Sequence, residues 1–297
     1  MTSTRFLACY AAIFGTFPYL TLKITWLTGG TLGLTDPSFV HSPLLFAGNL
    51  VTAAMDATAI VLAFALTYPW GRRIPAPLVL FPAWVGTGLL GPIVLVSPVI
   101  GVDLFAVPHG ELPLQDWVWG VVYGGFAWQG VALLTAFVFY VRDRWPALRS
   151  GASEPRGSAL RWVASGAAIG TAVLHLAWAF GSTFALVPGR TGTMSSHVMD
   201  GVFGVLTLLA VTASATRGAL WPRLVVIWLG TGSMFGWGAW MLFATLTGGP
   251  LAAGSTLIQA VAYTVQLVAA VALLAGVRQV SYRGSRSGTD ALALAAR

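Results

Sequence analysis

Four ionisable residues lie within long apolar stretches of the chain, in two similar sets. Lys23, the only lysine, is followed by Asp56 in the next apolar stretch, and His175 is followed by Asp200 in the second half. A charge at the centre of a membrane helix costs about 2.5–3.5 kcal/mol on insertion scales, so such residues normally face the protein interior and pair. We therefore expect Lys23 to pair with Asp56, and His175 to pair with Asp200.

Two aspartates beside two different bases are suited to general acid and base chemistry. Burial and neighbouring charges tune the acidity of a carboxyl group, and a positioned acid or base transfers protons in many enzymes. Lys23 and His175 stand at matching positions but differ in type, which favours two different environments for the aspartates, as acid and base roles require. The catalytic candidates are Asp56, Asp200, Lys23 and His175. The alternative is that each pair is only a structural clasp between two helices.

Helix rise predicts a similar depth for these side chains. Lys23 lies 18 residues after Arg5, and Asp56 lies 16 residues before Arg72. At ~1.5 Å per residue, both are on the order of 24–27 Å from the inner boundary of the membrane. Comparable distances from an arginine are found for His175, Asp200, Tyr123 and Tyr263. We expect these six residues to meet in one layer toward the outer face, with His197 one helical turn from Asp200.

Aromatic residues supply candidate walls for an apolar substrate pocket. The chain has 13 tryptophans, and an aromatic face suits a cation or a developing carbocation. Trp237 and Trp240 are spaced three apart with glycines beside them, a pattern that could wall a cavity. The alternative for most of the tryptophans is an aromatic belt at the membrane interface together with core packing. The candidate substrate-binding residues are Trp26, Trp178, Tyr123, Tyr263, His197, Trp128, Trp237 and Trp240.

The composition places the chain in the membrane class. Of its 297 residues, 57% are hydrophobic and only 8% are charged, which is far outside the range of soluble domains. Apolar windows of about 20 residues or more, as spanning requires, run through residues 6–29, 43–68, 76–100, 117–141, 160–187, 195–215, 222–246 and 255–277. We predict an all-α integral membrane protein with eight transmembrane helices.

The arginines predict the orientation. If eight helices alternate, fourteen of the fifteen arginines fall on one side and Arg190 alone falls on the other. This excess predicts that both termini are cytoplasmic. The net charge of +7 is then a signal of topology, with some attraction to anionic lipid headgroups, and no nucleic-acid partner is expected.

The chain contains an internal repeat. LKITWLTGGTLGL at 22–34 aligns with LHLAWAFGSTFAL at 174–186, and WVGTG at 84–88 aligns with WLGTG at 228–232. The offset between the copies is 152 at the first motif and 144 at the second. Because each copy has an even number of spans, both copies have the same orientation, as two parallel-oriented four-helix repeats. The predicted boundaries are a first repeat at 1–145, a polar linker at 146–159, a second repeat at 160–280 and a disordered tail at 281–297.

The string HLAWAFG at 175–181, with Pro188 soon after, resembles a known first-helix signature. It is similar to that of a family of short four-span bacterial membrane proteins of unknown function, in which His-x-x-Trp-x-x-Gly-Gly precedes a proline-containing loop. The resemblance implies a tandem duplication of such a unit in a bacterial plasma membrane, and it implies no activity. The first half departs from the signature at Lys23, which replaces the histidine. The second half departs at Ser182, which replaces the second glycine.

No cofactor is expected from the motifs. The Gly-Thr-Gly runs lack the strand, helix and lysine of a nucleotide-binding loop and favour close helix packing instead. Cys9 is the single cysteine, so one chain has no disulfide and no cysteine metal site. A metal site of His175, His197 and Asp200 is an alternative to a simple pair.

Three functions from different classes remain open. The first is a membrane-embedded enzyme that uses aspartate acid and base chemistry on an isoprenoid- or lipid-like substrate, as a cyclase or isomerase. The second is a small-solute or proton-coupled transporter, since parallel repeats and intramembrane charges occur in carriers. The third is a non-catalytic binding or immunity protein. The oligomeric state is left undetermined.

Overall fold

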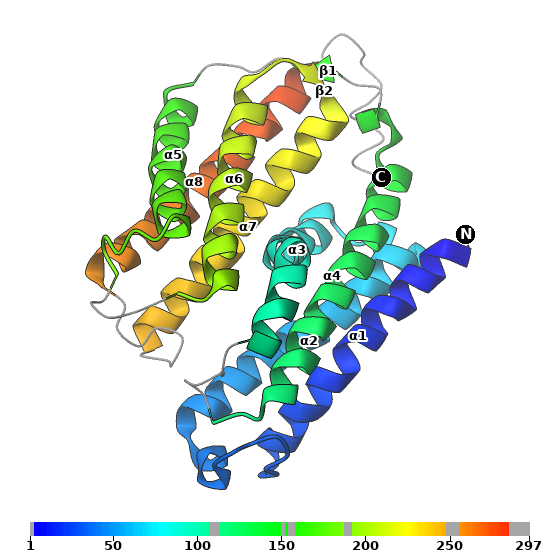
Figure 1. The fold of residues 1–297 in the computed structure, drawn as a ribbon. Helices are drawn as coiled ribbons and strands as arrows, with labels where there is room; N and C mark the ends of the chain where they lie inside the picture. Colours follow the sequence, from blue (N-terminus) through cyan, green and yellow to red (C-terminus); the bar gives the residue numbers. More distant parts are fainter. Residues whose placement is uncertain are drawn as a thin grey trace.

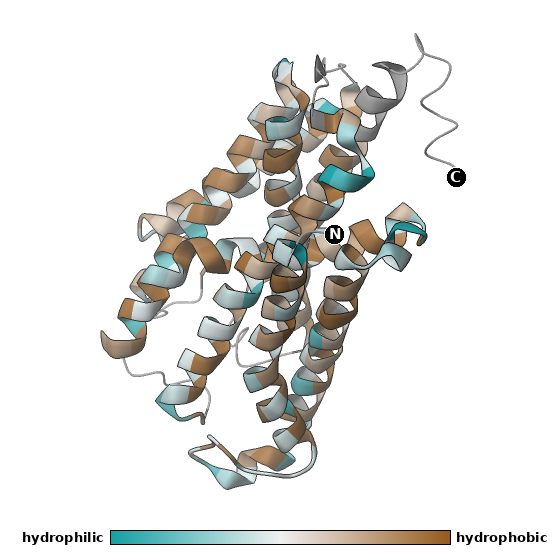
Figure 2. Cartoon of the chain, turned by 90° about the vertical axis from the view of Figure 1, so that its right-hand side faces the viewer, coloured by the Kyte–Doolittle hydropathy of each residue, from teal (hydrophilic) through white to brown (hydrophobic). Residues whose placement is uncertain are grey.

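The computed structural model describes residues 3–106, 113–149, 152–153, 158–186, 192–247 and 256–284. Eight helices in these ranges are long and apolar enough to cross a membrane, which confirms the predicted class. They are α1 (Ser3–Leu27), α2 (Pro43–Thr67), α3 (Ala76–Ala106), α4 (Asp116–Arg144), α5 (Ala159–Ala179), α6 (Met194–Ala215), α7 (Leu220–Thr247) and α8 (Leu257–Gly284). Figure 2 shows hydrophobic residues along these helices, and many large apolar side chains are exposed, as a lipid environment allows.

Short elements connect the helices. Three 3₁₀ turns, η1 (Pro37–His41), η2 (Pro69–Arg72) and η3 (Pro146–Arg149), each begin with proline, whose fixed φ suits a first helical position. In the predicted linker, β1 (Ala152–Ser153) pairs antiparallel with β2 (Gly218–Ala219), a ladder that the sequence did not predict. Of the predicted tail, residues 281–284 belong to α8, and 285–297 lie outside the described residues.

The helices form two groups of four. In the first, α1 packs against α2 and α4, and α3 packs against α4 and α2. In the second, α5 packs against α6 and α8, and α7 packs against the same two helices. Figure 1 shows the groups side by side, and α3 joins them by packing on α6 and α7.

The loops after α1 and α5 have the same backbone geometry. The indole N–H of Trp26 donates to the Leu32 carbonyl at 2.8 Å, and that of Trp178 donates to the Phe184 carbonyl at 2.9 Å. Gly29 and Gly181 end the two helices with φ of 88° and 85°, a left-handed conformation that favours glycine. The predicted window 160–187 was therefore too long, because α5 ends at Ala179.

The second half has Ser182 where the first half has Gly30, and this difference has a local explanation. A Cβ added at Gly30 would lie 2.5 Å from the Cγ2 methyl of Thr25. The position equivalent to Thr25 in the second half is Ala177, which has no such methyl. Ser182 therefore fits where the first half requires Gly30, and its hydroxyl accepts from the Phe184 amide at 3.2 Å.

The two halves meet through reciprocal contacts between the matching WVGTG and WLGTG segments. Trp84 Nε1 donates to Thr231 Oγ1 at 3.2 Å, and Trp228 Nε1 donates to Thr87 Oγ1 at 2.9 Å. Between these bonds the α3 and α7 backbones touch, since a Cβ added at Gly88 would lie 2.1 Å from the Gly232 carbonyl carbon. Such an exchange of identical contacts is the pattern of a two-fold interface.

Candidate functional site

The first predicted pair forms inside the first half and is sealed. Lys23 of α1 places Nζ 2.5 Å from Asp56 Oδ2 of α2. The side chains are only 1% and 8% exposed, respectively. The ammonium group also lies 3.6 Å from the centroid of the Tyr19 ring, where the π face attracts a cation. This pair joins α1 to α2 and has little access to any other molecule.

The second pair forms inside the second half and is more open. His175 Nδ1 of α5 lies 2.7 Å from Asp200 Oδ1 of α6, and the Asp200 side chain is 25% exposed. The other ring nitrogen, Nε2, lies 3.0 Å from Gln266 Oε1 of α8. Gln266 in turn donates from Nε2 to the Met234 carbonyl of α7 at 2.9 Å. Side chains of α6 and α8 thus hold the imidazole of α5, and the α7 backbone holds Gln266.

Aromatic rings surround that imidazole. Trp178 and Phe203 contact the His175 ring edge to face, with centroids 5.1 Å and 5.3 Å away. Trp237 continues the cluster, with its ring 5.3 Å from that of Phe203. Such faces favour a positive charge on or near the imidazole. Two of the predicted substrate-binding tryptophans, Trp178 and Trp237, therefore lie beside the second pair.

The remaining predicted aromatic residues make other contacts. Trp26 is bound to its own loop, as described above. Trp128 is 56% exposed on the outer surface, and its indole donates to the Ala11 carbonyl at 2.9 Å. Trp240 contacts Phe243. The predicted tyrosines are in separate halves, where Tyr123 stacks on Trp119 and Tyr263 is buried at 5% exposure.

The two predicted pairs form in separate halves of the described structure. Each pair lies within its own half, and an apolar cluster fills the space where the halves meet. The cluster has a buried part, Ile93, Val96 and Ile100, and a partly buried part that includes Tyr123, Val198, Met199, Val202 and Trp237. Each charge is neutralised by its neighbour in the adjacent helix, as predicted, and the common depth of the six residues stays a prediction.

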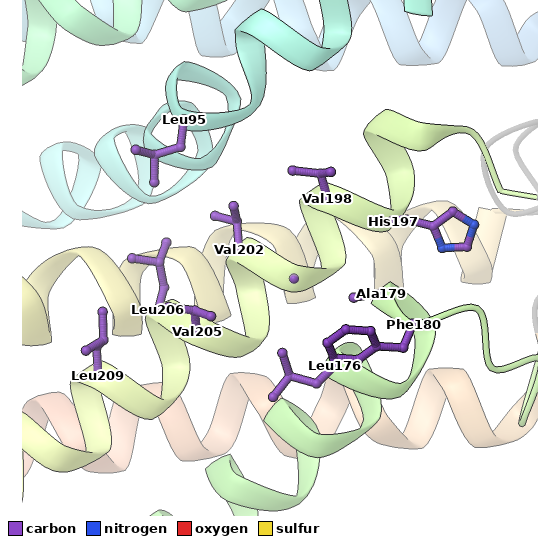
Figure 3. Close-up of a pocket in the computed structure, with 11 residues that line it drawn as sticks. Leu95, Leu176, Ala179, Phe180, His197, Val198, Val202, Val205, Leu206 and Leu209 are labelled. Carbon is purple, nitrogen blue, oxygen red and sulfur yellow. The ribbon is translucent and has the colours of Figure 1, made fainter.

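A groove runs along α6, and His197 belongs to its lining. Its volume is about 560 Å³, and its lining comes from α3, α5 and α6. The lining residues are Leu95, Leu176, Ala179, Phe180, His197, Val198, Gly201, Val202, Val205, Leu206 and Leu209. Figure 3 shows His197 at one end of this lining and Leu209 at the other. His197 is the only polar side chain among these residues.

His197 belongs to the groove lining and is near Asp200 in the sequence. It precedes Asp200 by three residues, so the two are neighbours on the helix surface. Its Nδ1 lies 2.8 Å from the Trp178 carbonyl oxygen, to which it must donate because a carbonyl only accepts. In the part of the chain that the structure describes, no three histidine, cysteine or acidic side chains gather as a metal site. The alternative metal site of His175, His197 and Asp200 is therefore not formed.

The sequence did not predict the polar contacts of three residues. Asp103 lies in the part of α3 beyond the predicted end at residue 100 and accepts from the Ser195 amide in the first turn of α6 at 2.6 Å. Arg5 was read only as a topology signal, yet its side chain is buried, pairs with Asp143 and donates to the Leu66 carbonyl at 2.9 Å. Gln266 was missed too, although a glutamine in an apolar window one turn from Tyr263 was a usable signal.

Comparison of the chain with protein-family models, with curated proteins and with solved structures finds no match. The function must therefore be argued from the geometry of the two pairs and the groove.

Proposed function

We propose that the protein is a membrane-embedded enzyme that transfers protons to and from an apolar, isoprenoid- or lipid-like molecule. The observation that carries the proposal is the difference between the two pairs. Lys23–Asp56 is sealed, whereas Asp200 is a quarter exposed and lies one turn from the end of the groove. In this proposal the His175–Asp200 pair is catalytic, and the Lys23–Asp56 pair holds α1 to α2.

The groove is the proposed site for a single apolar chain. From His197 to Leu209 it follows twelve residues of α6, or ~18 Å at the rise of a helix. One leaflet of a bilayer core is about half of 30 Å thick, so the groove matches the length of one lipid tail. Phe180 and Leu209, both in its lining, are exposed. A tail can therefore enter sideways from the lipid and leave its head near His197.

The proposed chemistry needs only a movable proton. A proton added to one carbon of a double bond and a proton removed from a neighbouring carbon give isomerisation or cyclisation with no net change in atoms. Asp200 is not part of the groove lining, but its side chain is a quarter exposed one turn beyond His197. In the proposal it exchanges the proton with the head of the substrate, while His175 holds a proton behind it. The rings of Trp178, Phe203 and Trp237 would stabilise positive charge on carbon.

The test compares the two aspartates, which are matched by the repeat. Purified protein is incubated in nanodiscs with a lipid extract, and new products are sought by mass spectrometry of the extracted lipids. Asp200→Asn should remain folded and lower the rate by at least about 10²-fold, the typical contribution of an acid or base. Asp56→Asn should lower stability and leave the rate per folded molecule nearly unchanged. Product formation at the normal rate by Asp200→Asn would refute the proposal.

One observation favours a purely structural function as the second candidate. Both pairs join the first helix of a half to the second, as a clasp would. In that case no product forms, and both aspartate variants only lose stability. A transporter would instead show proton-coupled flux in proteoliposomes, although α3 and α7 touch at the level of Gly88 and Gly232.

We also propose the bacterial plasma membrane as the location, with both termini in the cytoplasm. The support is the distribution of arginines, of which only Arg190 falls on the outer side. Reporters are fused after residue 149 and at the C-terminus. A reporter that fluoresces only in the cytoplasm should be fluorescent at both positions, and a phosphatase that is active only in the periplasm should be inactive at both. The reverse result at either position would overturn the orientation.

A further inference from the structure

Both ring nitrogens of His175 face hydrogen-bond acceptors. Nδ1 lies 2.7 Å from the carboxylate of Asp200, and Nε2 lies 3.0 Å from the amide oxygen of Gln266. A neutral imidazole carries one N–H and has one lone pair. A neutral His175 opposite an ionised Asp200 would therefore leave one nitrogen lone pair pointing at an oxygen lone pair.

The orientation of the Gln266 amide decides which nitrogen must carry a proton. Gln266 Nε2 donates to the Met234 carbonyl at 2.9 Å, so its Oε1 is the atom that faces His175. Turning the amide over would place two oxygens against each other at Met234. The bond to Met234 therefore requires an N–H at His175 Nε2. The proton between Nδ1 and Asp200 Oδ1 is then an additional one, whichever of the two atoms holds it.

The first half has no glutamine at the position equivalent to Gln266. At the offset of 140 that relates α4 to α8, the residue equivalent to Gln266 is Phe126. Phe126 packs edge to face on Tyr19, the ring over which Lys23 lies. A lysine needs no second acceptor to select a tautomer, because its ammonium group is charged without one. The glutamine is therefore found in the half whose base is an imidazole, and a phenylalanine stands in the half whose base is a lysine.

The groups that face His175 come from each helix packed on α5. Asp200 and Phe203 face it from α6, and Gln266 faces it from α8 with Tyr263 one turn away. From its own helix, Trp178 contacts the ring. His197, which is bound to the Trp178 carbonyl, is the next titratable side chain along α6.

We infer that Gln266 is a positioning residue that requires a proton on His175 Nε2, so that the His175–Asp200 pair stores one transferable proton between Nδ1 and Oδ1. The pair as a whole is then uncharged, as the Lys23–Asp56 pair is, which suits a buried site. This inference rests on the proposed function when it names the pair as the source of the proton for the reaction. The protonation state of the pair is inferred from the hydrogen bonds alone and does not depend on that function.

The test measures the protons directly. The full-length protein, labelled with ¹⁵N-histidine, is placed in nanodiscs, and the imidazole nitrogen signals are followed by NMR as the pH is raised. The chain has four histidines, and the signals that are missing in His175→Lys are assigned to His175. We expect His175 Nε2 to carry a proton throughout, with a second proton shared by Nδ1 at neutral pH. An unprotonated Nε2 at neutral pH would overturn the inference.

Two variants at Gln266 separate positioning from mere packing. Gln266→Leu removes the acceptor, so the pair should lose its shared proton at a lower pH than in the unaltered protein. Gln266→Glu supplies a stronger acceptor and should retain the proton to a higher pH. Shifts in the same direction, or no shift in either folded variant, would contradict the inference. If the NMR results hold but no lipid product is ever found, the proton store stands and the proposed enzyme function falls.

Discussion

At the residue scale, each half pairs an aspartate with a basic residue, and the basic residue differs between the halves. Lys23 and His175 stand at equivalent positions, and each is neutralised by an aspartate of the next helix. The lysine lies in a sealed site beside one carboxylate. The histidine is bonded through both ring nitrogens beside a carboxylate that is a quarter exposed, which makes the second half the place where chemistry is expected.

Removing one partner of the sealed pair should be costly. Asp56→Asn leaves the Lys23 charge buried and unpaired, which costs about 3–5 kcal/mol when a buried pair is broken. The loss is measured as a lower midpoint in denaturant titrations of the protein in detergent micelles. As a control, the double variant Lys23→Met with Asp56→Leu removes both charges and should recover most of the stability. A double variant no more stable than Asp56→Asn would show that packing, and not charge, is lost.

Exchange of the two cations tests whether the halves are interchangeable. His175→Lys should keep the fold, because a lysine pairs with an aspartate between the equivalent helices of the first half. It should abolish product formation, because the transferable proton of the imidazole is gone. Thermal unfolding and the lipid assay give the two readouts. Full activity in a folded His175→Lys protein would exclude the histidine from the reaction.

At the element scale, the loop after the first helix of each half requires unusual backbone angles at the same two positions. The first position is Gly29 or Gly181. The second is Gly33 in the first half, with φ of 76°, and Ala185 in the second, with φ of 63°. A residue with a Cβ is strained in this region by about 1–2 kcal/mol. The second half therefore carries strain that the first half avoids.

Substitution at this matched pair should act in opposite directions. Ala185→Gly should raise the free energy of unfolding by up to about 1 kcal/mol, since the relief of strain is partly offset by the greater freedom of glycine when unfolded. Gly33→Ala should lower it by more, because the new Cβ would also lie 2.5 Å from Val118. The measurement is thermal unfolding of both variants in the same detergent. A destabilised Ala185→Gly would mean that the alanine methyl makes contacts that outweigh the strain.

At the scale of the whole molecule, the two halves behave as two subunits of a symmetric dimer joined by a linker. The reciprocal Trp84–Thr231 and Trp228–Thr87 hydrogen bonds lie on either side of the contact between Gly88 and Gly232. Membrane helices without side chains at a crossing approach closely and gain van der Waals contact. This contact fixes the position of α3 against α7, and with it the position of the groove.

A methyl group at this contact should separate the halves. Gly88→Ala places a Cβ 2.1 Å from the Gly232 backbone, which no side-chain movement can relieve, and overpacking of this kind costs about 1–3 kcal/mol or more. Gly101→Ala, in the same helix, has nothing within 4 Å of the added Cβ and should be neutral. The readout is the unfolding midpoint together with disulfide cross-linking of cysteine pairs placed across α3 and α7. Equal stability of the two variants would refute the close contact.

The sequence by itself determined the class of the protein, the positions of its helices and the partners within each half. Helix length and apolar composition follow from the need to satisfy backbone hydrogen bonds in lipid, so each window overlaps one helix. The larger differences are that α5 ends early at Ala179, whereas α3 and α8 extend beyond their windows to Ala106 and Gly284. The pairing of Lys23 with Asp56, and of His175 with Asp200, followed from the cost of an isolated charge in the membrane.

Only the tertiary structure decided how open each pair is and what lies between the halves. Exposure depends on side chains from helices far apart in the sequence, as when Gln266 closes one side of His175 while Asp200 stays a quarter exposed. The groove likewise needs Leu95 of the first half beside α6 of the second. A sequence pattern indicates which residues share a helix face. The packing of two helices depends on the shape of both surfaces where they cross, and here the close approach requires both Gly88 and Gly232.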